Sequence, residues 1–347
     1  MADLQIYDED RSSLIEWLQA QQQPAFRVKQ LWEGLYKQLY SDFSQFANIP
    51  NSLKADLAAH FTLMPLTLIE SIHSKDNLTE KVLFQLQDGA RVETVLMRYE
   101  ERNSVCVSTQ VGCPMGCVFC ATGQMGYQRN LSAAEILGQV IYFMARLRSE
   151  GQNLTNVVYM GMGEPFLNFD SVMKSIARLT DPEGLNFGAR RITISTVGII
   201  PKIDRFAAEN SQVNLAVSLH SADNALRSQL VPANKIYPLN ALMKTCRQYV
   251  QTTHRRLTFE YALINEVNDS PEMAEQLAQL LTGLLCHVNL IALNPSKAYP
   301  LQGSPRERVN QFREILERHG INATIRLRRG VEIHAGCGQL ASSHSAE

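Results

Sequence analysis

The chain has 347 residues, of which 45% are hydrophobic and 19% are charged, and its formal net charge at pH 7 is −1. A chain of this length can bury a sizeable core, so we expect one large domain or one large and one small domain. The near-zero net charge excludes a global basic field that attracts nucleic acids, although a local basic patch can still bind them.

No targeting or membrane segment is evident. Residues 1–10 are acidic and lack the basic region and apolar core of a signal peptide. Apolar runs such as residues 288–293 are too short to cross a bilayer. We therefore expect no membrane partner and a cytoplasmic location, where thiols stay reduced.

The N-terminal part of the chain has a helical pattern. Apolar residues recur near helical spacing from residue 11 to residue 61, and the pattern ends near Met64 and Pro65. We assign residues 1–75 to a small helical accessory domain. Two β-rich runs, residues 82–86 and 92–97, then predict a hairpin, and residues 76–103 are assigned as a hairpin linker into the core.

From Ser104 onward, short β-rich runs alternate with helical patterns. Ser132 and Glu135 form the capping-box pattern that opens one of these helices. Repeated strand–helix units predict an α/β fold with a parallel sheet, arranged as a full or partial (β/α) barrel over residues 104–347. The expected strands are residues 105–108, 157–160, 192–195, 215–219, 257–264, 288–293 and 323–327.

Three of the seven cysteines lie in one short loop. Cys113, Cys117 and Cys120 are separated by three and by two residues. Three closely spaced thiolates can bind three irons of a four-iron cluster and leave the fourth iron open. Structural zinc sites usually have two Cys-x2-Cys pairs, and only one is present here. An odd, low number of cysteines disfavours a disulfide framework.

Polar residues and glycines follow the expected strands. Ligands bind beyond the carboxyl ends of parallel strands, so these residues are expected to meet at one site. A cluster with an open iron can bind S-adenosylmethionine (SAM) and produce a carbon radical from it. Glycines 161 and 163 allow close approach of a ligand, and Glu164 offers a carboxylate for the amino group of SAM. The other candidate SAM ligands are Ser195, Ser218, His220 and Asn294.

Four motifs in chain order carry a resemblance to a known family. The cysteine loop, residues 161–165, residues 218–220 and residues 337–340 together resemble the radical SAM RNA methyltransferases of the RlmN and Cfr type. The resemblance covers nearly the whole chain. It implies a partial barrel of radical SAM type, a 4Fe-4S cluster on Cys113, Cys117 and Cys120, two SAM molecules per turnover, and an accessory domain that contacts RNA. The implied SAM-binding residues are Gly163, Glu164, Ser195, Ser218, Leu219, His220 and Asn294.

The same resemblance assigns catalytic roles outside the cluster loop. Cys337, which lies between two glycines, corresponds to the methyl carrier, and Cys106 corresponds to the resolving thiol. The family's scheme includes a covalent protein–RNA intermediate on Cys337, followed by a Cys106–Cys337 disulfide. Glu93 corresponds to the acceptor of the proton from the base.

The implied reaction is methylation of an adenosine at carbon 2 in the peptidyl transferase centre of 23S rRNA, with tRNA as a further substrate. Methylation at carbon 8 of the same adenosine is the alternative within the family, and the sequence does not decide between them. Arg326, Arg328 and Arg329 precede Cys337 and are candidate phosphate contacts. We expect an electron-donating reductase such as flavodoxin as a partner, and a monomeric protein.

Two other classes of function share part of this pattern. A radical SAM activase that installs a glycyl radical in a partner protein requires the cluster but not Cys106 or Cys337. A non-catalytic iron–sulfur or RNA-binding protein likewise has no need of these two thiols.

Overall fold

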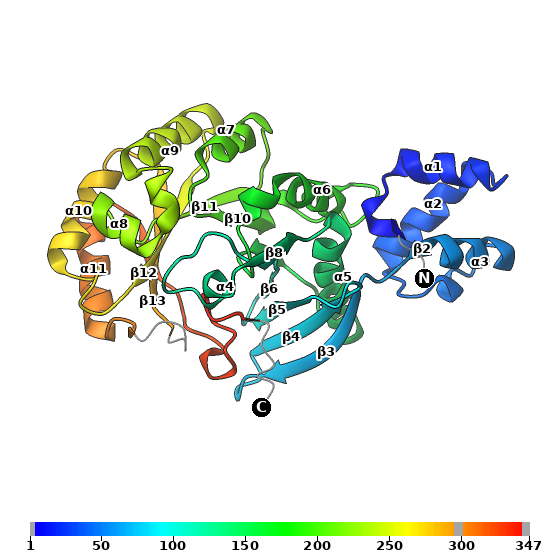
Figure 1. The fold of residues 1–347 in the computed structure, drawn as a ribbon, viewed down its shortest axis with the longest axis horizontal. Helices are drawn as coiled ribbons and strands as arrows, with labels where there is room; N and C mark the ends of the chain where they lie inside the picture. Colours follow the sequence, from blue (N-terminus) through cyan, green and yellow to red (C-terminus); the bar gives the residue numbers. More distant parts are fainter. Residues whose placement is uncertain (1–3, 295–300, 342–347) are drawn as a thin grey trace.

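The computed structural model describes residues 4–294 and 301–341. A small helical unit at the N-terminus lies beside α5 and α6 of the larger α/β part (Figure 1). Side chains such as Leu14, Leu31 and Phe46 are buried in it, which confirms the amphipathic helices expected here. The elements of this unit are β1 (Leu4–Gln5), α1 (Arg11–Ala20), α2 (Arg27–Trp32), a π-helical turn (Glu33–Gln38), α3 (Asn51–His60) and β2 (Phe61–Thr62).

The segment between the helical unit and the core differs from the prediction. Three antiparallel strands, β3 (Leu66–His73), β4 (Thr79–Leu86) and β5 (Arg91–Arg98), form a meander instead of a two-stranded hairpin. The expected pair is β4 and β5, and β3 occupies residues that we assigned to the helical domain. Strand β3 lies at the edge of the sheet with most of its residues at least partly exposed, so it lacks the alternation that identifies a half-buried strand.

The predicted α/β architecture is confirmed. The main sheet has ten strands in the order β14-β13-β12-β11-β10-β9-β6-β5-β4-β3, and every neighbouring pair from β6 to β14 is parallel. Among the described strands β14 and β3 are the two edges, so the sheet is open and the barrel is partial. The parallel strands are β6 (Asn103–Cys106), β9 (Asn156–Tyr159), β10 (Ile192–Thr196), β11 (Asn214–Ser218), β12 (Leu257–Leu263), β13 (Cys286–Ala292) and β14 (Ala323–Ile325).

Helices connect these strands along the outside of the sheet (Figure 1). The predicted capping box is present, because Ser132 Oγ accepts from the backbone N–H of Glu135 and the Glu135 side chain accepts from that of Ser132. The connecting helices are α5 (Ala133–Ser149), α6 (Phe169–Thr180), α7 (Ile200–Ala208), α8 (Asn224–Leu230), α9 (Leu239–Thr253), α10 (Pro271–Leu281) and α11 (Arg306–Arg318). No helix in the described ranges is long and apolar enough to span a membrane.

The cysteine loop is carried by a second, small hairpin that the sequence did not predict. Strands β7 (Gln110–Gly112) and β8 (Tyr127–Asn130) pair antiparallel, and the loop between them contains the short helix α4 (Ala121–Gln124). Gly112 has a φ of 74°, and a Cβ atom there would lie 1.9 Å from the carbonyl oxygen of Gly126. Only glycine therefore allows the two arms of the hairpin to approach this closely.

Candidate active site

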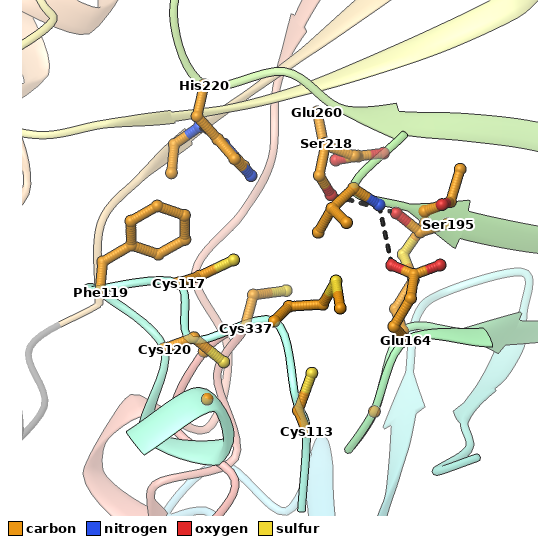
Figure 2. Close-up of a pocket in the computed structure, with 18 of the residues that line it drawn as sticks. Cys113, Cys117, Phe119, Cys120, Glu164, Ser195, Ser218, His220, Glu260 and Cys337 are labelled. Atoms are coloured by element: carbon orange, nitrogen blue, oxygen red, sulfur yellow. Dashed lines mark hydrogen bonds between the residues drawn. The ribbon is translucent and has the colours of Figure 1, made fainter. Parts of the chain in front are cut away.

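Cys113, Cys117 and Cys120 line one cavity at the carboxyl ends of the parallel strands (Figure 2). Local hydrogen bonds hold their loop: the N–H of Cys113 donates to the carbonyl of Gly126 at 2.9 Å, and the N–H of Cys120 donates to the carbonyl of Cys117 at 3.1 Å. Cys113 and Cys117 are buried and Cys120 is partly buried. The predicted convergence of the three thiols on one site is therefore present.

These thiols are costly to ionise without a cation. Burial raises the pKa of Cys113 to about 12, and burial followed by the nearby Cys120 and Cys113 raises that of Cys117. A bound metal centre removes this penalty, since it stabilises the thiolate form. Within the described ranges, no three His, Cys, Asp or Glu side chains are grouped to hold one metal ion. A 4Fe-4S cluster does not need such convergence, because each thiolate binds a different iron. The donor set therefore fits a cluster.

Residues after β9 form the facing wall. In Figure 2 the carboxylate of Glu164 lies across the cavity from Cys113 and Cys117. Its Oε2 accepts from the N–H of Val197 at 2.8 Å, and its Oε1 accepts from the N–H of Phe166 at 3.0 Å. Burial raises the pKa of this carboxyl group to about 7 despite these hydrogen bonds.

The glycines before Glu164 are required by the protein's own packing. Gly163 has a φ of 101°, and a Cβ atom there would lie 2.6 Å from Cβ of Gln110 on β7. The N–H of Glu164 also donates to Oε1 of Gln110 at 2.8 Å. A Cβ atom on Gly161 would lie 2.7 Å from the carbonyl oxygen of Val107. We expected both glycines to admit a ligand, and they line the cavity, but these close contacts within the protein are sufficient reason for their presence.

The ends of β10 and β11 contribute two hydroxyl groups to the same wall. Ser195 and Ser218 both line the cavity, and their Oγ atoms lie 3.3 Å apart (Figure 2). Leu219 does not line this cavity. It is buried, and its main chain donates to the carbonyl of Glu260 at 3.0 Å and accepts from Arg227 Nε at 3.0 Å.

His220 lines the cavity at the top of the view in Figure 2, and its imidazole ring is neutral. Its Nδ1 accepts from the N–H of Ala262 at 3.0 Å, and Phe119 of the cysteine loop contacts its ring edge to face with centroids 4.9 Å apart. Burial, with a further contribution from Arg227, lowers the pKa of His220 to about 3. The backbone of His220 is left-handed with a φ of 59°, a conformation that costs energy for this residue type and is held here by its neighbours.

Cys337 lies against the cysteine loop although it follows it by more than 200 residues. Two hydrogen bonds from α4 hold the C-terminal segment: the N–H of Ala121 donates to the carbonyl of Gly338 at 2.7 Å, and the hydroxyl Oγ1 of Thr122 donates to the carbonyl of Leu340 at 2.6 Å. Asn294 Nδ2 donates to the carbonyl of Cys337 at 3.2 Å. The thiol of Cys337 is exposed and lines the cavity, as expected from its flanking glycines.

A second cavity adjoins the first and contains Cys106. Cys106, Cys120 and Cys337 line it together, so Cys337 borders both cavities. Burial raises the pKa of the Cys106 thiol to about 12, and the nearby Cys337 raises it further. Both thiols are free in the structure. The two cysteines that the resemblance paired are therefore neighbours in space.

Glu93 borders neither cavity. It lies on β5, which pairs with β6 through Val95 and Cys106, and its side chain is buried. Its Oε1 forms an ion pair with Lys81 Nζ at 2.8 Å, and its Oε2 accepts a hydrogen bond from the N–H of Ala341 at 2.8 Å. Both carboxylate oxygens are thus occupied, one of them by the C-terminal segment that carries Cys337.

Sequence reasoning missed several residues of the cavity wall, including Phe119 and Glu260. Glu260 is a buried carboxylate on β12, with Asn289 Nδ2 donating to its Oε1 at 2.9 Å and Arg326 Nη1 lying 4.0 Å from its Oε2. The sequence did contain a signal for Glu260, because it is the one charged residue in the largely apolar strand β12. Arg326 lines both cavities, whereas Arg328 donates to Asn294 Oδ1 at 3.0 Å and Arg329 stacks over Tyr99.

Comparison with known families matches two parts of the chain. Residues 107–280 match the radical SAM superfamily, and residues 4–63 match the ribosomal RNA large subunit methyltransferase N-terminal domain. The first match includes the cysteine loop and the wall that faces it. Membership of this superfamily implies a 4Fe-4S cluster and SAM as cofactors. The second match covers the helical unit.

Relatives match nearly the full length of the chain. A probable dual-specificity RNA methyltransferase RlmN of Chloroflexus aurantiacus is 48% identical over 98% of this chain and 93% of its own length. The corresponding protein of Geobacillus kaustophilus is 47% identical over 99% of this chain and 93% of its own. The crystal structure of a radical SAM methyltransferase from Sphaerobacter thermophilus is 50% identical, with a TM-score of 0.96 over 98% of this chain and all of that one. The chain therefore belongs to the RlmN family of radical SAM RNA methyltransferases.

Proposed function

We propose that this RNA methyltransferase acts at carbon 2 of an adenosine in the peptidyl transferase centre of 23S rRNA, and also on tRNA. The relatives at 47–48% identity are named as dual-specificity enzymes, which supports two RNA substrates. The observation that carries the mechanism is the position of Cys337, which borders the cavity of the cysteine loop on one side and that of Cys106 on the other.

The residues of the first cavity hold the cofactors. Cys113, Cys117 and Cys120 would hold the 4Fe-4S cluster. SAM would be bound by the wall residues Gly163, Glu164, Ser195, Ser218, His220 and Asn294, with Leu219 supporting that wall. When bound, these groups supply one-electron cleavage of the sulfonium and a carbon radical. Two SAM molecules are used per turnover, and a reductase such as flavodoxin delivers the electron to a monomeric, cytoplasmic protein.

Cys337 and Cys106 direct the chemistry to the base. Cys337 carries the methyl group as a thioether and then holds the RNA covalently, which anchors the base while its ring loses a proton. Glu93 accepts that proton once the C-terminal segment releases its Oε2. The Cys106 thiolate then attacks the sulfur of Cys337, and the sulfur–sulfur bond forms as the sulfur–carbon bond breaks. The bonding pair passes to the carbon attached to the base, which takes up a proton to become the methyl group, and the two cysteines are left as a disulfide. An unpaired or flipped base is the substrate that enters such a site at least cost.

The position of methylation is tested in cells. Mass spectrometry of 23S rRNA and tRNA from cells with and without the gene should show 2-methyladenosine only where the protein is present. Methyl groups at carbon 8 would establish the alternative position, and RNA that is the same in both strains would contradict the proposal.

The roles of the two thiols are tested separately. Cys337→Ala should abolish methylation, because the methyl carrier is lost. Cys106→Ala should trap a protein–RNA adduct, visible as a slow band on a denaturing gel that nuclease removes. Cys246→Ala is the matched control, since Cys246 is buried in the core away from both cavities. Native methylation by Cys337→Ala would refute the mechanism, and a wild-type protein that methylates no RNA would favour an activase or a binding protein.

A further inference from the structure

Arg227 is a fully buried guanidinium next to the candidate active site. It lies on α8 with an exposed fraction of 0%. Its Nε donates to the carbonyl of Leu219 at 3.0 Å, its Nη1 donates to Asn234 Oδ1 at 2.6 Å, and its Nη2 donates to the carbonyls of Val197 at 2.7 Å and Ser218 at 3.2 Å. Every one of these acceptors is neutral.

The charge of Arg227 has no protein counter-ion in the described part of the chain. None of the ion pairs formed by the other arginines includes it. A buried charge without an opposite charge is strongly unfavourable, even when neutral groups satisfy its hydrogen bonds. The remaining candidate is an anionic group bound by the protein.

The cysteine loop packs directly on the helix that carries Arg227. The N–H of Val118 donates to the carbonyl of Leu230 at 3.2 Å, and Cys117 and Phe119 pack in one apolar cluster with Leu230 and Val231. The helix that carries Arg227 therefore lies against the loop that carries Cys117, and two of the carbonyls that Arg227 binds belong to Val197 and Ser218 of the cavity wall.

The hydrogen bonds also fix the guanidinium in place. Val197 donates its N–H to Glu164 and accepts from Arg227 at its carbonyl, so both main-chain polar groups of Val197 are bound by these two side chains. The carbonyls of Ser218 and Leu219 hold Arg227 at the end of β11. These contacts restrict the position of the charge relative to Cys117.

We propose that Arg227 is the counter-charge of the iron–sulfur cluster and raises its reduction potential. This role rests on the proposed binding of the cluster by Cys113, Cys117 and Cys120. Three thiolates make the site strongly anionic, and the reduced cluster carries one more negative charge than the oxidised cluster. A fixed positive charge in a buried, low-dielectric region stabilises the reduced state more than the oxidised state. Arg227 is thus a positioning residue that favours delivery of the electron.

The test is a redox titration of the reconstituted protein, followed by electron paramagnetic resonance, with iron content measured on the same samples. Arg227→Gln should retain iron and shift the midpoint potential to a more negative value. Arg227→Lys keeps the charge and should stay near wild type. Arg247→Gln is the matched control, because Arg247 also donates to two carbonyls, those of Leu280 and Thr282, but does so away from the cavity.

Asn234→Asp provides a second route that leaves Arg227 in place. The side chain that accepts from Arg227 Nη1 becomes a carboxylate, which neutralises the guanidinium. The midpoint potential of the cluster in this variant should therefore also become more negative. Potentials equal to wild type in both Arg227→Gln and Asn234→Asp, with full iron content, would overturn the role of Arg227. A wild-type protein that assembles no cluster under the same conditions would instead contradict the proposed function.

Discussion

The side-chain amide of Asn294 links Cys337 to Arg328. Its Nδ2 donates to the carbonyl of Cys337 at 3.2 Å, and its Oδ1 accepts from Arg328 Nε at 3.0 Å. A Cβ atom on Gly336 would lie 2.6 Å from the same Nδ2. Asn294, which we expected to bind SAM, therefore fixes the backbone of the segment that contains Cys337.

Separating the two hydrogen bonds of Asn294 tests this link. Asn294→Asp keeps the acceptor for Arg328 but removes the donor to the carbonyl of Cys337. The free energy needed to open residues 330–341 locally should therefore fall by about 1 kcal/mol, the usual net value of one hydrogen bond. Hydrogen exchange of residues 330–341 should become faster, and the methylation rate should fall. Arg328→Gln, which affects the other hydrogen bond, should alter exchange less. Equal exchange in wild type and Asn294→Asp would show that this contact does not hold the segment.

Substitutions of Lys81 and Glu93, which form an ion pair, should have non-additive effects on the free energy of unfolding. Both side chains are largely buried, with exposed fractions of 12% and 5%. Lys81→Met leaves the buried carboxylate of Glu93 without an opposite charge and should lower the free energy of unfolding by about 3 kcal/mol. Adding Glu93→Gln should recover most of the loss. Urea unfolding of the double-mutant cycle measures this coupling.

A more exposed ion pair serves as the control for that cycle. Arg98 and Glu150 lie 2.7 Å apart with exposed fractions of 19% and 34%. Arg98→Met should cost less than about 1 kcal/mol, because solvent screens the pair. Equal losses for Lys81→Met and Arg98→Met would contradict the distinction drawn from burial.

Glu164 should make stability depend on pH. Burial raises the pKa of its carboxyl group from 4.5 in the unfolded reference to about 7 in the folded protein. Between these values the folded state binds more protons than the unfolded state, so the free energy of unfolding should fall as pH rises from 4.5 to 7 and then level off. The change corresponds to roughly 3 kcal/mol.

Comparison with a neutral side chain isolates this effect. Glu164→Gln lacks the titrating group, so the difference in unfolding free energy between wild type and Glu164→Gln should vary over this pH range alone. Denaturant unfolding at a series of pH values gives the difference directly. A difference that is constant from pH 4.5 to 7 would mean that Glu164 is ionised throughout.

Gly163→Ala should destabilise the site by both strain and overlap. Its φ of 101° is unfavourable for alanine, and the new Cβ would lie 2.6 Å from Cβ of Gln110. Together these effects should cost about 2–4 kcal/mol. Gly151→Ala is the matched control, because its φ is 72° but open space surrounds it, so only the smaller strain cost is expected. Circular dichroism during urea unfolding compares the two variants.

Much of the fold could be predicted from local pattern. Buried parallel strands and amphipathic helices have distinct periodicities, so the strand–helix alternation after Ser104 and the capping box at Ser132 were identified correctly. Strand β3 was missed because an exposed edge strand has little apolar alternation. The β7–β8 hairpin was missed because each of its arms is only three or four residues long.

The sequence by itself determined the chemistry of this protein, because the spacing of Cys113, Cys117 and Cys120 within one loop and the order of the later motifs are local properties of the chain. Only the tertiary structure decided which side chains meet. Cys337 lies between the two cavities, Glu93 is held by Lys81 and Ala341, and Arg227 is buried behind the cysteine loop. These contacts join residues far apart in sequence, and their geometry follows from how the strands and helices pack rather than from any local pattern.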